Sequence, residues 1–574
     1  MRSRLPERSA VVGVSLAFAA AVVAAFRGTF ANGAVWDDKF LTIDNPYLAP
    51  GKLAALFTHD LWTASASHEQ SSFYRPLPML DFALDRAAFG NVPAGYHAGN
   101  LALHLGVAAA LAWLVVSVLD RDDVPRAYGF GAGALAALAF ALAPVNAEPV
   151  LWISGRFDLL AALFALLALL AHRGEGRAAA PLATLAFGAA LLCKESAVAV
   201  PVLLALDDAI VLERPLRAAR AKYAAMAAVL VAVVAVRSAV GVAPSDVAAG
   251  PWGLLASYAF LLSTFARLVA WPVGLDTFHP YAAPSSGATL ATLAAAAALV
   301  AALVLAVRRA KESVTWRATL FGFAWFLVAL APAATTGPNL GIVGDRYAYL
   351  PAAGLAVALA AWLERAVAWI AASPRSRALG PALACLALLG AFSRRVAART
   401  LDFRDDRALY EASLRTHPDG VHALTGLGAL AAEQKRLDEA DALLARALAR
   451  EPGNWRALSA LCYVRLHQNR LLDGEAACVQ SGAVNGSNPR VWVNLATLYV
   501  RRRAWDKALV AAEHALAVRP VYAEARYLAA VSLANLGRLP EAAAELHEAL
   551  AVDPKHAGAN DLAKQLERFR AVRQ

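Results

Sequence analysis

Two adjacent aspartates, Asp37 and Asp38, follow the first apolar run of the chain, in the stretch AVWDDKFLTIDNPYL. Neighbouring carboxylates repel each other, and this repulsion raises the pKa of one of them. Such a carboxylate can deprotonate a hydroxyl group or bind a divalent cation. The alternative interpretation is a pair of loop or helix-capping aspartates. The pair is therefore a candidate catalytic site just beyond an apolar segment.

Ionisable residues also recur in four short clusters at the ends of other apolar runs. Charged side chains near bilayer depth are costly, so such clusters are functional candidates by default. Their basic members can bind a phosphate group, and their acidic members can deprotonate an acceptor hydroxyl or hold a divalent cation. Snorkelling side chains and ion pairs between helices are the alternative. The predicted phosphate-binding residues are Arg156, Lys194 and Arg346, and the predicted supporting residues are Arg75, Glu148, Asp158 and Asp345.

The composition indicates a membrane protein. The chain has 574 residues, of which 59% are hydrophobic and only 17% are charged, and its mean hydropathy is +0.49. Its formal net charge of +10 comes largely from basic residues in short linkers between apolar runs, as is typical of cytoplasmic loops. We find no basic face interleaved with aromatic residues, so we expect no nucleic-acid partner.

Apolar runs of membrane-spanning length predict about eleven transmembrane helices in an all-α first domain, residues 1–395. The basic N-terminus predicts a cytoplasmic start and an exterior loop at 27–97. A further apolar segment, 252–271, is predicted to be re-entrant or interfacial, because another crossing would put a basic loop outside. The predicted spans are 9–26, 98–118, 129–143, 157–171, 178–193, 197–212, 221–240, 287–307, 317–333, 347–371 and 378–393.

Helical repeats are predicted after a linker and first helix at 396–418. Pro418, Pro452, Pro520 and Pro554 are spaced by multiples of about 34 residues, the period of the tetratricopeptide repeat, and Gly486 occupies the remaining position. Residues 419–574 are therefore predicted to form an α-solenoid of about four repeats and a C-terminal helix. The concave surface of such a stack binds extended peptides, so we expect a protein acceptor or partner there.

Cys462 and Cys478 lie in the second repeat, on helices predicted to face each other. An exterior, oxidising compartment permits a disulfide between them. Two buried cysteines that pack as small apolar residues are the alternative.

The membrane half carries the segments WDD, YRPL, GYHAGNLALHL, GRFDLLAALF, KES and DRYAYLP ahead of the repeats. In this order the chain resembles the transmembrane and tetratricopeptide repeat-containing (TMTC) proteins of the GT-C superfamily of membrane glycosyltransferases. The resemblance implies a GT-C fold and transfer of a sugar, typically mannose, from a dolichyl- or polyprenyl-phosphate donor. The acceptors would be Ser or Thr hydroxyls of proteins on the exoplasmic side. It also implies that Asp38 is the base, with Asp37 as its partner, and that Arg156 and Arg346 contact the donor phosphate.

The chain departs from the family pattern in one loop. Family members often read His-Pro-Val-His-Thr-Glu where this chain reads APVNAE, so Ala143 and Asn146 replace both histidines while Glu148 remains. A metal or proton-transfer role for that loop is therefore in doubt, and the cofactor is unknown, with a divalent cation as one option. The Ala- and Arg-rich composition indicates a multi-pass protein of a bacterial inner membrane, with a polyprenyl donor and periplasmic repeats.

Three other functions fit parts of the sequence. The first is a transferase that acts on a glycan or lipid acceptor. The second is a non-catalytic membrane scaffold that presents the repeats, which the intact WDD motif and the clustered outer charges disfavour. The third is a transporter, which the sparse charges at mid-membrane and the lack of a detectable internal repeat disfavour.

Overall fold

The computed structural model describes residues 8–65, 71–120, 126–242, 250–281, 286–335, 341–372 and 375–573. The chain divides into two compact units, Met1–Ala412 and Ser413–Gln574. The division lies within 396–418, the stretch that the sequence predicts to connect the two domains.

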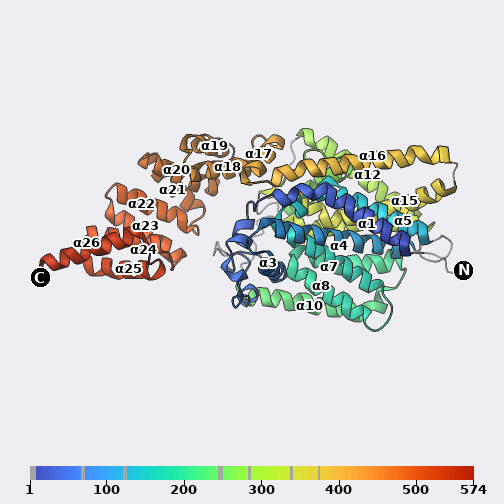
Figure 1. Cartoon of the computed structure of the whole chain (residues 1–574), viewed down its shortest axis with the longest axis horizontal. Coiled ribbons are helices and arrows are strands. Elements are labelled where there is room, and N and C mark those ends of the chain that lie inside the picture. The colour runs from blue at the N-terminus through green and yellow to red at the C-terminus, as the bar shows by residue number, and fades with distance from the viewer. Residues whose placement is uncertain are drawn as a thin grey trace. The chain divides into compact units, whose positions relative to one another are not determined.

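The first unit is a bundle of long apolar helices. Each predicted apolar run forms helix, because its Ala- and Leu-rich stretches combine high helix propensity with an apolar surface. Helices α4, α7, α8 and α10 pack side by side in that order (Figure 1). The long helices of this unit are α1 (Arg8–Phe26), α4 (Pro93–Leu119), α5 (Arg126–Leu142), α7 (Arg156–Arg173), α8 (Ala179–Cys193), α10 (Arg220–Ala239), α11 (Pro251–Ala270), α12 (Ser286–Arg309), α13 (Val314–Leu330), α15 (Tyr349–Ala372) and α16 (Arg375–Arg399).

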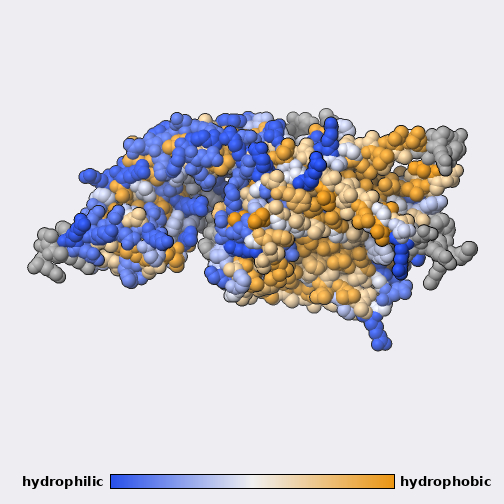
Figure 2. All heavy atoms as spheres, viewed as in Figure 1, coloured by the Kyte–Doolittle hydropathy of each residue, from blue (hydrophilic) through white to orange (hydrophobic). Residues whose placement is uncertain are grey.

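Among the described residues, eight helices are long and apolar enough to cross a membrane, or nine if one bent pair forms a single span. Figure 2 shows the broad apolar surface that these helices present. The first unit is therefore a multi-pass membrane domain, with fewer qualifying spans than the eleven predicted. One predicted span, 197–212, is divided among η6 (Glu195–Ala199), α9 (Val200–Leu206) and η7 (Asp207–Val211). The segment 252–271, predicted to be re-entrant or interfacial, is a 20-residue helix that qualifies as a span.

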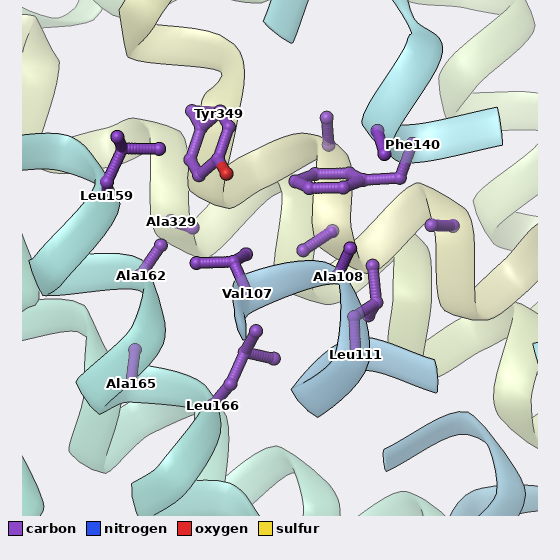
Figure 3. Close-up of a cluster of buried hydrophobic side chains, with 14 of the residues drawn as sticks. Val107, Ala108, Leu111, Phe140, Leu159, Ala162, Ala165, Leu166, Ala329 and Tyr349 are labelled. Carbon is purple, nitrogen blue, oxygen red and sulfur yellow. The ribbon is translucent and has the colours of Figure 1, made fainter. Parts of the chain in front are cut away.

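Small residues set the helix spacing in the core of this unit. Gly322 on α13 and Gly354 on α15 face each other so closely that a Cβ on Gly322 would meet the Gly354 carbonyl oxygen. Such close backbone approach is a common basis of helix packing in membranes. Figure 3 shows the adjoining cluster, in which Val107 and Leu111 of α4 pack near Leu166 of α7, with Phe140 and Tyr349 close by.

The segment between α1 and α4 forms a separate small core over the end of the bundle. Its apolar residues include Leu41, Met79 and Phe82, which pack with Ile153 of η5 and with Phe157 at the start of α7. The short elements here are η1 (Arg27–Ala31), η2 (Lys39–Ile43), η3 (Pro46–Leu48), α2 (Ala55–Thr58) and α3 (Pro76–Phe89).

Short elements from three other connections complete this end of the bundle. Strand β1 (His279–Pro280) pairs antiparallel with β2 (Ile342–Val343), with His279 opposite Val343. The predicted polar clusters lie on these connections and on the neighbouring helix ends. The elements are η4 (Pro144–Asn146), α6 (Glu148–Leu151), η5 (Ile153–Gly155), η9 (Ala331–Thr335) and η10 (Asp345–Ala348).

The second unit is a stack of antiparallel helix pairs, which confirms the predicted tetratricopeptide repeats. Each pair joins a helix of 13 residues to one of 14. The structure joins Cys462 on α20 to Cys478 on α21 through a disulfide. The helices are α18 (Val421–Glu433), α19 (Leu437–Arg450), α20 (Trp455–His467), α21 (Leu471–Val484), α22 (Pro489–Arg501), α23 (Trp505–Val518), α24 (Ala523–Asn535), α25 (Leu539–Val552) and α26 (Ala557–Arg573); α17 (Asp406–Thr416) precedes them.

Candidate active site

Asp38 lies directly before η2 and is fully buried. Its Oδ1 accepts hydrogen bonds from the backbone N–H and the Oγ–H of Ser154, at 2.8 and 2.6 Å, and its Oδ2 accepts one from the Val35 N–H at 3.1 Å. Burial raises the pKa of Asp38 to about 7, although the hydrogen bonds from Ser154 and Val35 oppose this rise. The predicted raised pKa is thus present, but burial is its main cause, whereas we predicted repulsion from the half-buried Asp37.

Trp36, two residues before Asp38, has a strained backbone. Its φ is +53°, a left-handed conformation that costs a non-glycine residue about 1–2 kcal/mol. Asp406 of α17 holds it there, because its carboxylate accepts hydrogen bonds from the Trp36 N–H and the Lys39 ammonium, both at 2.7 Å. The Trp36 ring stacks on Trp152 with 5.2 Å between ring centroids. Strain of this kind is frequently found at functional sites.

The Trp36–Trp152 pair connects Asp38 to a group of basic residues. The Arg346 guanidinium lies 4.9 Å from the centre of the Trp152 ring and 5.6 Å from that of Trp36. Arg346 and the Lys194 ammonium each lie 5.1 Å from the Tyr347 ring. The structure therefore brings two of the three predicted phosphate-binding residues together beside the WDD motif.

Burial and neighbouring charges shift the pKa of the Lys194 ammonium. Burial lowers its pKa, the repulsion from Arg75 and Arg346 lowers it further, and the attraction of Asp158 opposes both. The predicted supporting residue Arg75 is thus close enough to Lys194 to act on it. Arg346, Lys194 and Arg75 thus lie close together, and such a group of basic side chains can bind an anionic ligand.

Each base in this group has an acidic partner. Glu148 accepts hydrogen bonds from the backbone N–H and the guanidinium of Arg346, at 3.1 and 2.5 Å. Asp158 pairs with Lys194 at 2.5 Å, and Glu195 pairs with Arg75 at 2.8 Å. These carboxylates orient the bases, a role that differs from the proton transfer or cation binding predicted for the acidic residues. Because each is already bonded to a base, they offer no ready set of ligands for a divalent cation.

Two predicted site residues lie in other networks. The Arg156 guanidinium is fully buried and donates to Asn100, Asp81, Asp85 and the Tyr96 carbonyl. A phosphate would have to displace these partners, so the contacts of Arg156 indicate a structural ion pair. Asp345 accepts from His279 at 2.8 Å and from Arg399 at 2.5 Å. Through these two contacts Asp345 links η10 to His279 on β1 and to Arg399 on α16.

A cavity of about 510 Å³ lies between α5, α15 and α16. Its walls are almost entirely apolar, and Arg395 of α16 is the only charged residue among the described residues that line it. The exposed Arg395 has no acidic partner in the described part of the chain. Asn146 of η4 also lines the cavity, and η4 packs against η10, the element that carries Arg346. Element η4 therefore lines the cavity on one side and contacts the element that carries Arg346 on the other.

The sequence analysis did not predict roles for Trp152 and Ser154. Ser154 donates to Asp38, and Trp152 contacts both Trp36 and Arg346. Both lie in the segment WISGRF, beside the predicted Arg156. Their neutral side chains gave no signal of their own, since aromatic and hydroxyl residues are common near membrane interfaces. Trp152 has a buried indole N–H without a hydrogen-bond partner among the described residues, which sets it apart from an ordinary core tryptophan.

The chain matches curated relatives in its sequence. It is 31% identical over 205 residues to the human protein O-mannosyl-transferase TMTC3, a match that covers 34% of this chain and 21% of that protein. Mouse TMTC1 is 34% identical over 185 residues, 30% of this chain and 18% of the relative. These relatives are TMTC protein O-mannosyl-transferases. The resemblance predicted from the motifs is thereby confirmed.

The match to the TMTC proteins is partial. It spans about a fifth of the length of the two relatives above, and 28% of human TMTC4, which is 32% identical over 209 residues. No family model matches the chain. Among solved structures, the chain is similar to YrrB, described as a TPR protein with an unusual peptide-binding site, at 20% identity and a TM-score of 0.25, over 28% of this chain and 81% of that one.

Proposed function

We propose that this chain is a membrane glycosyltransferase that moves a sugar, most simply mannose, from a polyprenyl-phosphate donor to Ser or Thr hydroxyls of proteins. The observation that carries the proposal is the arrangement of Asp38, the stacked Trp36–Trp152 pair and the Arg346–Lys194 group at one end of an apolar bundle. It combines a base, an aromatic surface and a site for an anion. The names of the TMTC relatives agree with this chemistry.

Asp38 is the proposed base. The acceptor hydroxyl oxygen attacks the anomeric carbon of the sugar, and its proton passes to the Asp38 carboxylate. The hydrogen bond from the Ser154 hydroxyl to Asp38, at 2.6 Å, has the geometry that a Ser or Thr acceptor would adopt. An acceptor would replace this hydroxyl or donate to Oδ2, which accepts the Val35 N–H at 3.1 Å. Asp37 stays a proposed partner of Asp38.

The basic group is the proposed site of the leaving phosphate. When the anomeric C–O bond breaks, the electron pair stays on the phosphate and increases its negative charge. Arg346, Lys194 and Arg75 would stabilise that charge, and their buried setting makes the interaction stronger than in water. Arg156 could join them only by releasing its present partners, so we assign it a minor part.

The apolar cavity is the proposed site for the lipid chain of the donor. A polyprenyl chain requires a groove lined with apolar residues that opens toward lipid, and helices α5, α15 and α16 supply apolar walls. Because η4 forms part of the wall and packs against η10, a lipid in the cavity would have its phosphate near Arg346. The charge pattern of the loops supports an exoplasmic location for this end of the bundle and for the repeats. The repeats would recruit the acceptor or a partner protein.

The donor class can be tested with purified protein in lipid nanodiscs. Polyprenyl-phosphate [³H]mannose, polyprenyl-phosphate [³H]glucose and GDP-[³H]mannose would each be incubated with the protein and a Ser/Thr-rich peptide. We expect label on the peptide from a lipid-linked sugar and none from the nucleotide sugar. Label from GDP-mannose, or label on lipid or glycan alone, would contradict the proposal.

A further inference from the structure

Three basic side chains from successive repeats lie close together in the second unit. Lys435 follows α18, His467 ends α20 and Arg501 ends α22. The Lys435 ammonium donates to the Tyr463 hydroxyl at 2.8 Å, and the Tyr463 ring lies edge-on to the His467 ring at 4.2 Å. Arg501 donates to the carbonyl of Leu466, the residue before His467, at 2.9 Å. Burial lowers the pKa of His467, and the charges of Lys435 and Arg501 lower it further, which places both close to it.

This group has no acidic partner among the described residues. Helices α20 and α22 contain no Asp or Glu. Other arginines of the same repeats are paired: Arg465 contacts Asp441 at 2.8 Å, and Arg502 contacts Glu475. Several arginines of the repeats are therefore neutralised, whereas the Lys435–His467–Arg501 group is exposed and has no acidic partner in the described part of the chain.

Lys435 occupies a position whose left-handed backbone conformation recurs in the following repeats. Lys435 has a φ of +60°, and its equivalents one, two and three repeats later are Asn469, Arg503 and Gly537, with φ of +60°, +57° and +80°. Glycine is the favoured residue in this conformation, whereas a lysine costs about 1 kcal/mol or more. Asn469 and Arg503 bear the same cost, so this backbone conformation supplies a matched control position for Lys435 rather than evidence of function.

We propose that Lys435, Tyr463, His467 and Arg501 form a binding site for the carboxylate side chains of an acidic protein segment. The three bases come from three successive repeats, so they form a row that an extended peptide can follow. Tyr463 adds a hydroxyl group and an apolar ring surface between two of the bases. Charge complementarity selects an acidic peptide as the occupant. The site is independent of the proposed transfer chemistry and would exist in a protein without transferase activity.

The full chain in phosphatidylcholine nanodiscs tests this proposal by fluorescence anisotropy. The probe is a fluorescein-labelled peptide of six Glu-Ser repeats, compared with one of six Gln-Ser repeats. We expect binding of the Glu-Ser peptide only. Lys435→Gly and Arg501→Gln should each weaken binding about fivefold or more, since each removes one charge-assisted contact. Lys435→Gly should also raise the unfolding temperature of the repeats, because it relieves the left-handed backbone.

Arg503→Gly is the matched control. It removes the same charge and relieves the same backbone conformation in a neighbouring repeat, outside the group. It should raise the unfolding temperature but change the affinity less than twofold. Equal weakening by Lys435→Gly and Arg503→Gly would overturn the proposal in favour of diffuse charge attraction. Absence of Glu-Ser binding would overturn it as well. Displacement of the peptide by phosphatidylglycerol in the discs would assign the group to lipid instead.

Discussion

Glu148 and Arg346 are 198 positions apart in the sequence, yet one carboxylate accepts hydrogen bonds from both the backbone N–H and the guanidinium of the arginine, at 3.1 and 2.5 Å. This double contact fixes the position of η10 as well as the direction of the Arg346 side chain. It explains how Arg346 lies over Trp152 rather than extending to solvent. The pair thus links α6, which carries Glu148, to η10, which carries Arg346, and holds these two connections together at the site.

A methyl group at Gly344 should disturb this pair. A Cβ there would meet the Arg346 guanidinium and lie 2.8 Å from Glu148 Oε1, so both side chains would have to move. We expect Gly344→Ala to lower kcat/KM about tenfold or more, because small displacements of positioning groups are costly in catalysis. Gly131→Ala on α5, where no heavy atom lies within 4 Å, is the control. Radiolabel transfer and thermal unfolding would be measured for both, and full activity of Gly344→Ala would refute the positioning role.

A second prediction concerns pH. Because the pKa of Asp38 is about 7 and a base must be ionised, the transfer rate should rise with pH to a plateau, with its midpoint near pH 7. Ser154→Ala should move the midpoint to higher pH, because the lost hydroxyl stabilises the ionised carboxylate. Thr42→Ala should leave it unchanged, since the Thr42 hydroxyl donates to the Asp38 carbonyl instead. A rate that falls as pH rises, or equal shifts in both variants, would contradict the assignment.

A third prediction separates Arg156 from Lys194. Arg156→Ala removes the partner of the Asp81 and Asp85 carboxylates and should destabilise the membrane domain by about 3–5 kcal/mol, as expected for a broken buried ion pair. Lys194→Gln should instead lower transfer with a smaller loss of stability, because Lys194 pairs with one carboxylate, Asp158, whereas Arg156 pairs with two. Unfolding in detergent and radiolabel transfer would be compared. An Arg156→Ala protein of normal stability that no longer uses the donor would restore the phosphate role predicted for Arg156.

A fourth prediction concerns the disulfide of the repeats. Cys462 and Cys478 are separated by 16 positions, and closing a loop of that length stabilises the folded state by about 3 kcal/mol in the chain-entropy model. The double variant Cys462→Ala/Cys478→Ala should therefore be digested faster in its repeats by protease. Because both cysteines are buried, we expect a maleimide to label them in a Cys193→Ala/Cys385→Ala protein unfolded in detergent only after reduction. Labelling without reductant would contradict an oxidised pair and the exoplasmic location of the repeats.

The membrane helices could be predicted from the sequence because their apolar runs exceed the length of a buried soluble helix. The segment 252–271, which we predicted to be re-entrant or interfacial from the charge of the 308–317 loop, stays a prediction. Its helix, Pro251–Ala270, qualifies as a span by length and composition. Loop charges indicate which side a connection occupies but do not determine how a particular helix packs.

The site could be predicted only in part. Arg346, Lys194 and Glu148 are recognisable because ionisable residues are rare beside apolar runs. Their pairing is not, since the partners come from distant segments: nothing in the sequence near Arg156 indicates that Asp81 and Asp85 neutralise it. Burial of Asp38 likewise depends on tertiary packing.

The most direct test of the central claim is the transfer of label from polyprenyl-phosphate [³H]mannose to peptide or water, comparing the wild type with Asp38→Asn in purified form. The variant keeps the shape of the side chain and can still accept from Ser154. It should unfold at no lower temperature above pH 7, where burial of the raised-pKa carboxylate in its charged form costs stability. We predict transfer by the wild type and a loss of at least about a hundredfold in the variant. Equal transfer by both proteins would show that Asp38 is not the base, and absence of transfer by the wild type with any lipid-linked sugar would contradict the proposed enzyme.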